Sequence, residues 1–387
     1  MKQYLVSAAR GEDAYRTARQ ALEGIEPPKV KGLKVLLKPN AARLLPHTAG
    51  ATTHPQVVAA AIDYFRGLGA ARVAVGESPI TGVRVSEAFQ RGGIAQVAAE
   101  RRVELLDFDA EPYQVLELPR GRVVRHIKVS WFWSEFDFVV SLPVMKTHMH
   151  TSVTLAVKNM KGMLWRRQKV AFHQIHAPQE VCGGEKELDL AIADMAGVLY
   201  PHLAVVDGII GMEGLGPGAG QPKGAGLVVA SREALAADWV SCRLMGLEPE
   251  KVAHLRLAAR VRGFDPAAIR CRPRDCLAWT NAFARPPEKI SFRYPGVVVH
   301  DQDSCSACQN TLYLFLEKYH HRLRPAQDGG EPLHLALGPG VHDLPAGTIY
   351  VGNCSCRLPE AQGGIKVVGC PPVASQVWEK CRPGGKD

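Results

Sequence analysis

"LKVLLKPN" (Leu33–Asn40) and "ARVAVGESP" (Ala71–Pro79) flank "THPQVVAAAIDYFRGLGA" (Thr53–Ala70), and this succession predicts the fold. The two outer stretches are short and rich in aliphatic residues, which is typical of buried strands. The middle stretch repeats apolar residues at helical spacing, with Thr53 as the expected N-cap and Gly69 as the stop signal. A strand, a helix and a second strand in this order favour a parallel pair joined by a crossover helix.

The same alternation continues through the first two thirds of the chain. A second helix is expected over residues 85–100. Further strands are expected in "VELLDF" (103–108), "DFVVSLPVMKTH" (137–148), "LAVVDGIIGMEG" (203–214) and "GLVVAS" (226–231). Short apolar strands separated by helices predict an α/β fold, with a mostly parallel sheet covered by helices on both faces. Ligands of such a sheet are expected beyond the C-terminal ends of its strands.

Composition divides the 387 residues into three parts. Residues 1–263 are expected to form the α/β domain. Residues 264–296 are rich in Pro and Arg with weak periodicity, and they are expected to be a linker or an irregular excursion. Residues 297–387 are expected to form a smaller, cysteine-rich α/β region.

The net charge of the chain and the lack of targeting signals in its sequence indicate which ligands and which location to expect. The net charge is +9, but the basic residues are scattered and no nucleic-acid module is present, which favours a small anionic ligand over nucleic acid. No run of about 18 apolar residues occurs, so no membrane partner is expected. The N-terminal stretch lacks the features of a signal peptide, so a cytoplasmic location is expected.

Cysteines gather in the last part of the sequence. Six of the ten follow residue 300: Cys305, Cys308, Cys354, Cys356, Cys370 and Cys381. In a reducing cytosol this favours metal or redox chemistry over disulfides. The C-x-x-C pair opens an apolar helix, whose dipole favours thiolates. If the strands that end at Cys354 and Cys370 are parallel neighbours, the C-terminal tips of these strands lie close together.

Four of these thiols are expected to hold an oxygen-sensitive [4Fe-4S] cluster: Cys305, Cys308, Cys354 and Cys370. The prolines after Cys370 and the lack of a second C-x-x-C favour the cluster over zinc. Zinc remains the alternative cofactor, and small buried apolar side chains are the alternative role. Cys356 is the substitute for Cys354. The other cysteines are expected mainly in the core, with a second metal site at Cys271 and Cys276 as the alternative.

"SLPVMKTHMHTSVTLAVKNMKGMLW" (Ser141–Trp165) is the second informative stretch. A strand is expected to end near Val144, followed by polar groups, and a helix to begin near Ser152. Its lysines, Lys146, Lys158 and Lys161, predict a site at the end of the strand that binds a carboxylate or a phosphate. A solvated basic face is the alternative, as is a mononuclear metal at His148 and His150.

The expected pocket combines this stretch with polar residues at other strand ends. The catalytic candidates are Lys146, His148, Lys158, Asp207 and Glu213, with the two carboxylates handling protons. The cofactor-binding candidates are Lys38, Asn40, His54, Lys161 and His173. A glycine-rich loop follows residue 213 and lets a ligand approach the backbone closely, although it is neither a P-loop nor a dinucleotide motif.

Six segments in consistent order resemble the domain-of-unknown-function family 362. They are "LKPN", "THP", "VGESP", "PVMKTHMHTSVTLAVKNMKG", "VVDGIIGMEGLGPGAG" and "AADWVSCRLMG", within residues 33–263. Members of that family often carry iron–sulfur ligands after the shared domain, and "CSACQNTLY", "GNC" and "GCPP" resemble a version of that appendage. The repeated ferredoxin pattern is absent, so the resemblance does not imply a two-cluster electron wire.

The resulting hypothesis is a [4Fe-4S] oxidoreductase that acts on a small anionic substrate or cofactor in a Lys/His-lined pocket. One alternative is a non-enzymatic electron carrier or a cluster-bearing accessory protein. Another is an isomerase or racemase that uses Lys/His chemistry beside a structural cluster or zinc. Two protein partners are considered. One is a redox protein, and the other is a second copy of the chain, with which it would form a homodimer.

Overall fold

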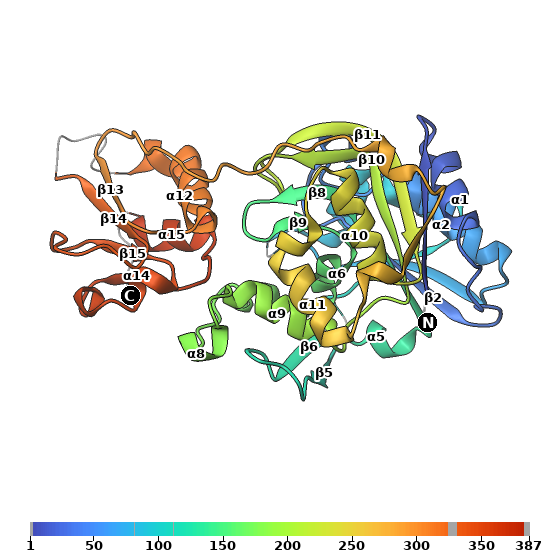
Figure 1. Cartoon of the computed structure of the whole chain (residues 1–387), viewed down its shortest axis with the longest axis horizontal. Helices are drawn as coiled ribbons and strands as arrows, with labels where there is room; N and C mark the ends of the chain where they lie inside the picture. The colour runs from blue at the N-terminus through green and yellow to red at the C-terminus, as the bar shows by residue number, and fades with distance from the viewer. Residues whose placement is uncertain (1–2, 81, 111, 324–330, 383–387) are drawn as a thin grey trace. The chain divides into compact units, whose positions relative to one another are not determined.

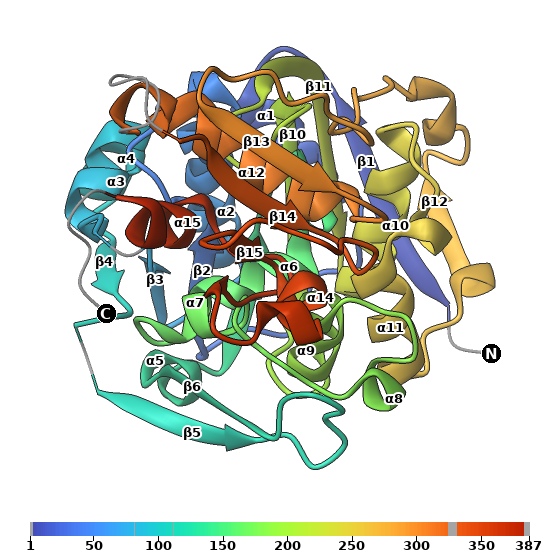
Figure 2. The same cartoon turned by 90° about the vertical axis from the view of Figure 1, so that its left-hand side faces the viewer.

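The structure is a computed structural model that describes residues 3–80, 82–110, 112–323 and 331–382. The chain divides into two compact units, drawn in Figures 1 and 2. The first unit is Met1–Lys169 with Asp189–Arg285, and the second is Val170–Leu188 with Pro286–Asp387. Within the stretch expected as a linker, residues 264–296, β12 (Ile269–Arg272) pairs with the first strand of the chain.

A large, mostly parallel sheet forms the centre of the first unit, as the sequence predicts. Its main path is β12, β1 (Tyr4–Arg10), β11 (Gln221–Ser231), β10 (Leu203–Glu213), β7 (Phe138–Leu142), β2 (Lys34–Pro39), β3 (Arg72–Glu77) and β4 (Glu104–Asp107). The pairs from β10 through β7, β2 and β3 to β4 are parallel, whereas β11 is antiparallel to both of its neighbours. β8 (Val144–His148) pairs with β10 and with β9 (Ser152–Thr154).

Helices cover both faces of this sheet. They are α1 (Ala14–Glu23), α2 (Pro55–Gly67), α3 (Val85–Gly92), α4 (Ile94–Glu100), α5 (Phe132–Glu135), α6 (Ala156–Asn159), α9 (Glu187–Ala196), α10 (Ala234–Leu244) and α11 (Ala253–Arg262). Figure 1 shows α1 and α2 on the side of the sheet opposite α10 and α11. A separate antiparallel pair joins β5 (Tyr113–Glu117) and β6 (His126–Ser130).

Short 3-10 helices and the one-turn helices α7 and α8 also occur along the chain. They are η1 (His47–Ala49), η2 (Met160–Met163), η3 (Pro249–Lys251), η4 (Pro266–Ala268), η5 (Cys276–Trp279), η6 (His320–Arg322), η7 (Pro359–Ala361), α7 (Gln168–Ala171) and α8 (Gln179–Cys182).

Several predicted boundaries are wrong for local reasons. Helix α2 begins at Pro55 with His54, not Thr53, as its N-cap, since proline at the first helical position has no N–H to satisfy. The helix predicted over residues 85–100 is two helices, because Gly93 between them takes a φ of 80°. The long strand predicted over 137–148 is split at Pro143, between β7 and β8.

The second unit is a smaller α/β layer with a sheet of its own. Its four strands are all parallel and follow chain order: β13 (Val297–Asp301), β14 (Leu333–Leu337), β15 (Ile349–Val351) and β16 (Ile365–Val367). Helices α12 (Ser306–Tyr319) and α15 (Ala374–Cys381) pack together, with the Tyr319 and Trp378 rings stacked 4.6 Å apart. The one-turn helix α14 (Asn353–Cys356) follows β15.

Gly76 on β3 tests how tightly the first unit is packed. A Cβ at this position would lie 2.1 Å from a ring carbon of the buried Phe108. Gly76→Ala should therefore destabilise the unit by about 1–3 kcal/mol, because the ring has to move. Gly67→Ala is the matched control, since no atom lies within 4 Å of its added Cβ. Urea unfolding of both variants measures the difference, and an equal midpoint would contradict the packing argument.

Candidate functional site

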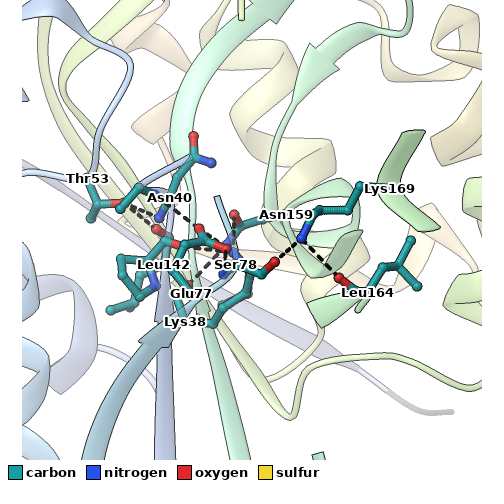
Figure 3. A network of polar contacts seen from close by, with 12 residues as sticks. Lys38, Asn40, Thr53, Glu77, Ser78, Leu142, Asn159, Leu164 and Lys169 are labelled. Carbon is teal, nitrogen blue, oxygen red and sulfur yellow. Dashed lines mark hydrogen bonds and ion pairs between the residues drawn. The ribbon is translucent and has the colours of Figure 1, made fainter. Parts of the chain in front are cut away.

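A buried ion pair joins the ends of the central strands β2 and β3. The Lys38 ammonium donates hydrogen bonds to Glu77 Oε2 at 2.8 Å, to the Pro39 carbonyl at 2.8 Å and to Asn159 Oδ1 at 3.0 Å. Both charged side chains are 1% exposed. Glu77 also accepts the Ala41 N–H at 3.0 Å. Figure 3 shows these side chains pointing toward one another. Lys38, predicted to bind a cofactor, thus has three acceptors within the protein.

Asn159 extends this network to the neighbouring strand. Its amide donates to the Lys38 carbonyl at 3.1 Å and to Ser141 Oγ at 3.0 Å. Burial lowers the pKa of Lys38, and the charge of Glu77 opposes that shift. Gly162 leaves room for the pair, since a Cβ there would lie 2.3 Å from Glu77 Oε1. Sequence reasoning missed Asn159, because a lone asparagine on a short helix carries no spacing signal.

Asp207 and His54 meet at the N-terminus of α2. The Asp207 carboxylate accepts the His54 N–H at 2.6 Å and the Ile209 N–H at 3.0 Å. Burial raises the pKa of Asp207 to about 6, while the two backbone donors oppose the shift. Burial also lowers the pKa of His54 to about 4, and the neighbouring His47 adds to this effect. The strand expected over residues 203–214 forms as β10, which runs past Asp207 to Glu213 with a register shift between Gly208 and Ile210.

Asn40 directly follows β2 and is held through its backbone N–H. Its N–H donates to Thr53 Oγ1 at 2.7 Å, and the Thr53 hydroxyl donates to the Leu142 carbonyl at 2.7 Å. These bonds fix the chain after β2 against the end of β7 (Figure 3). The Asn40 Oδ1 atom is buried and has no hydrogen-bond partner within the described residues. A buried acceptor of this kind suits a donor supplied by a ligand.

Five cations, which we call the cation cluster, lie near one another around β8 and η2: Arg43, Lys146, Lys158, Lys161 and Lys169. Burial lowers the pKa of Lys146 well below its usual range, and Lys158 and Arg43 lower it further. Burial likewise lowers the pKa of Lys158 to about 7, with Asp189 opposing and Arg43 adding to the shift. Mutual repulsion of this kind is relieved when an anion binds.

The members of the cation cluster differ in their partners. Lys146 donates to the Ala51 carbonyl at 3.0 Å. Lys169 hydrogen-bonds the Ser78 hydroxyl and lies 3.2 Å from Asp109 Oδ2. Burial lowers the pKa of Lys161 well below its usual range, with Lys158 and Lys169 adding to the shift. The cluster thus includes one lysine paired with a carboxylate and others that repel one another.

The helix predicted to begin near Ser152 is wrong. Residues 152–154 form β9, which places Thr154 opposite Lys146 across the antiparallel pair. The helix that carries Lys158 is only the short α6, and Asp238 holds its first turn by accepting the Ala156 N–H at 2.7 Å. Burial raises the pKa of Asp238 to about 7. Sequence reasoning missed Asp238, which lies inside an apolar helix far along the chain.

The glycine-rich loop after β10 packs against the strand of Lys146 and His148. A Cβ at Gly216 would lie 2.0 Å from the Thr147 carbonyl oxygen, and one at Gly218 would lie 2.7 Å from Arg43 Nε. Close approach of backbone to backbone therefore requires glycine at the first position. The loop positions Arg43, a member of the cation cluster that the sequence did not single out.

His148 and His150 contact each other, whereas Glu213 has other partners. His148 Nδ1 accepts the His150 N–H at 3.1 Å, and the two rings lie 5.5 Å apart. Glu213 lies 3.1 Å from Lys223 and accepts the Ala284 N–H at 2.8 Å. These contacts lower the pKa of Glu213, with the Ala284 hydrogen bond the largest cause. Glu213 therefore has partners of its own outside the cation cluster.

The four cysteines predicted as ligands lie on three segments of the second unit. Cys305 caps α12 and Cys308 lies in its first turn, and their thiols hydrogen-bond each other. Cys354 follows β15 and Cys370 follows β16, and these two strands are parallel neighbours, which is the condition under which the sequence places their tips close together. The charges of Cys354 and Cys370 both raise the pKa of Cys308, after its contact with Cys305 and its burial.

Local contacts separate Cys354 from Cys356. Cys354 is exposed and interacts electrostatically with Cys305, whereas Cys356 is buried and donates to the Tyr350 carbonyl at 3.3 Å. Cys356 packs among apolar side chains on the other face of the sheet. Burial raises its pKa to about 11. One turn of helix thus points the two thiols to different sides, and the sequence alone could not assign them.

His173 belongs to the cysteine-bearing unit. Its ring nitrogen lies 3.2 Å from the Pro371 carbonyl, and its own carbonyl accepts the Cys370 N–H at 3.0 Å. Glu187, missed by sequence reasoning, accepts from Asn353 at 3.1 Å and Arg357 at 2.8 Å in the same region.

The described residues contain neither a group of side chains converging on one metal ion nor a helix suited to cross a membrane. Among residues 3–80, 82–110, 112–323 and 331–382, no three or more His, Cys, Asp or Glu side chains converge as ligands for a single metal ion. Over those same ranges, no helix has the length and apolar character needed to cross a membrane.

A double-mutant cycle measures how strongly the Lys38–Glu77 pair is coupled. Glu77→Gln should cost about 3–5 kcal/mol of unfolding free energy, because it leaves a buried ammonium without its counter-charge. Lys38→Met combined with Glu77→Gln should cost less than the two single changes added together. The exposed pair Lys251–Glu248, at 2.8 Å, is the matched control, with an expected coupling of about 0.2–1 kcal/mol. Equal coupling at both pairs in urea unfolding would refute the prediction.

Comparisons with known proteins agree with the order of motifs along the first unit. The model of the family described as domain of unknown function, DUF362, matches residues 35–243. Thylakoid-associated protein sll1697 of Synechocystis sp. is 29% identical over 259 residues, which are 65% of this chain and 75% of that protein.

Two solved structures match the chain weakly. The lactate racemase apoprotein from Thermoanaerobacterium thermosaccharolyticum gives a TM-score of 0.40 at 12% identity, over 61% of this chain and only 56% of that chain. A crystal structure of a protein from Thermotoga maritima gives a TM-score of 0.33 at 12% identity, over 84% of this chain and 71% of that chain. The family match over residues 35–243 spans more than half of the sequence, and the chain therefore belongs to the DUF362 family.

Proposed function

We propose that the protein is an iron–sulfur oxidoreductase that acts on a small anionic substrate or cofactor. The observation that carries the proposal is the set of four thiols, Cys305, Cys308, Cys354 and Cys370, which influence one another's pKa values. Thiolate sulfur is the ligand that [4Fe-4S] clusters take from proteins. Zinc is the alternative occupant, and it would require the four thiols to draw together, because no three of the described His, Cys, Asp or Glu side chains converge on one ion.

The chemistry of the donor set fits such a cluster. A metal ligand has to be deprotonated, and the hydrogen bond from Cys308 lowers the pKa of Cys305 to about 6. Gly352 lies against Cys308, and a Cβ there would be 2.9 Å from its sulfur. The φ of Gly352 is 96°, a conformation that side chains other than glycine rarely adopt. A bare backbone next to the thiol keeps space around the sulfur.

When bound, a [4Fe-4S] cluster supplies one-electron transfer. In the first unit, the cation cluster would hold the negative charge of the substrate. Lys158, whose pKa burial lowers to about 7, is suited to give or take a proton near neutral pH. Burial, Lys158 and Arg43 all lower the pKa of Lys146, and the bound anion would stabilise its charged form.

Lys158 also supports a second candidate, an isomerase or racemase with a structural metal centre. An amine that titrates near neutrality can serve as a general base without any redox partner. A non-enzymatic electron carrier would need the cysteine site but no cation cluster. Activity that survives removal of iron favours the isomerase, whereas reduction of iron without any bound anion favours the carrier.

Iron and acid-labile sulfide in protein purified without oxygen test the metal centre directly. We expect about four of each per chain and an absorption band that dithionite bleaches. Cys370→Ser and Cys354→Ser should each lower the iron content sharply. Cys356→Ser is the matched control and should retain iron, because its thiol faces the apolar side of the sheet. Zinc without sulfide, or equal loss in all three variants, would overturn this assignment.

Sulfate binding tests the cation cluster independently of the metal centre. Sulfate keeps its charge between pH 6 and 8, so a change in affinity reports on the protein. Because the pKa of Lys158 is about 7, its charge is lost over this range and affinity should fall about tenfold from pH 6 to 8. Lys158→Met should remove the pH dependence measured by calorimetry, and exposed Lys29→Met should preserve it. Binding that strengthens with pH would contradict the proposal.

A further inference from the structure

A cavity of about 990 Å³ lies in the first unit, apart from the cation cluster. It is bounded by α10, by β12 and by the segments on either side of β12. Its lining includes three arginines and one thiol: Arg243, Arg270, Arg274 and Cys271. No carboxylate is among the lining residues, so the cavity favours a negatively charged occupant.

Two cysteines meet at the wall of this cavity. Cys271 lies on β12, opposite Val6 of β1, and is partly buried. Cys276 begins η5 and has no exposed surface. The two thiols hydrogen-bond each other. A reagent in the cavity can therefore reach Cys271 but not Cys276.

The surroundings favour a thiolate at the accessible position. The hydrogen bond from Cys276 lowers the pKa of Cys271 to about 7, with burial opposing and Arg243 adding to the shift. The same contact raises the pKa of Cys276. Cys242, by contrast, is fully buried on α10 and its pKa is raised well above the usual range, as for a core cysteine.

We propose that Cys271 and Cys276 form a reactive dithiol that reduces a small anionic disulfide bound in the arginine-lined cavity. Cys271 is the attacking thiol because it lines the cavity, and Cys276 is the resolving thiol because it is fully buried, does not line the cavity and interacts with Cys271. The three arginines hold the carboxylates of the disulfide.

The reaction is two successive thiol–disulfide exchanges. In the first, the Cys271 thiolate bonds to one sulfur of the disulfide, the S–S bond breaks, and the leaving thiolate takes a proton from water. In the second, Cys276 loses its proton to solvent and attacks the Cys271 sulfur, which breaks the mixed disulfide and releases the second thiol. The anionic disulfide gains two electrons, and the protein dithiol becomes a disulfide.

Charge selectivity is the property that tests this proposal. The reduced full-length chain is treated without oxygen with oxidised glutathione, with neutral hydroxyethyl disulfide and with cationic cystamine. Oxidation of the pair is followed by alkylation and mass spectrometry of the peptides that contain Cys271 and Cys276. Each rate is divided by the rate of dithiothreitol with the same disulfide. We expect the normalised rate for oxidised glutathione to exceed that for the neutral disulfide about tenfold.

Variants separate the roles of the two thiols and the arginines. Cys276→Ser should accumulate the mixed disulfide on Cys271, and Cys271→Ser should leave Cys276 unmodified. Arg274→Gln should remove most of the preference for glutathione, whereas the exposed Arg91→Gln, with the same change of charge, should not. Circular dichroism checks that each variant is folded. An absent anionic preference, or a first adduct on Cys276, would overturn the proposal.

Discussion

The buried Lys38–Glu77 ion pair is the contact on which the first unit depends. It joins the ends of β2 and β3 and, through Asn159, reaches the short helix that carries Lys158. A charge buried this completely is tolerated only when its partner and its remaining hydrogen bonds are all in place. The ion pair lies close enough to the cation cluster for Glu77 and Lys38 to have opposite effects on the pKa of Lys146, so they largely offset each other there, whereas Lys158 and Arg43 lower that pKa.

The polar residues at the strand ends are of two kinds, which differ in the groups that surround them. Asp207, Glu213 and Asp238 accept backbone N–H groups and hold the ends of segments in place. Lys146 and Lys158 have their charged forms disfavoured by burial and by neighbouring cations, Arg43 among them in both cases. The first kind stabilises the scaffold, and the second keeps a local potential that an anion can relieve. This division explains why the lysines, rather than the carboxylates, are the stronger candidates for contact with a ligand.

The sequence predicted the α/β class and the parallel order of strands, because apolar runs and helical spacing are local signals. It could state only on a condition that the strand tips before Cys354 and Cys370 lie together, and the parallel pairing of β15 with β16 meets that condition. It misplaced the helix near Ser152, because a one-turn helix and a three-residue strand leave no periodic pattern. It could not separate Cys354 from Cys356, because that assignment depends on side-chain direction, which is not a local signal.

The parallel sheet of the second unit adds its strands in the same order as the chain runs. During synthesis on the ribosome, each strand can therefore pair with the one made before it. Cys305 and Cys308 would leave the ribosome ahead of β14, whereas Cys354 and Cys370 would arrive only with β15 and β16. A nascent chain stalled between these strands carries two of the four thiols. Loading of any cofactor is in this way tied to completion of the sheet.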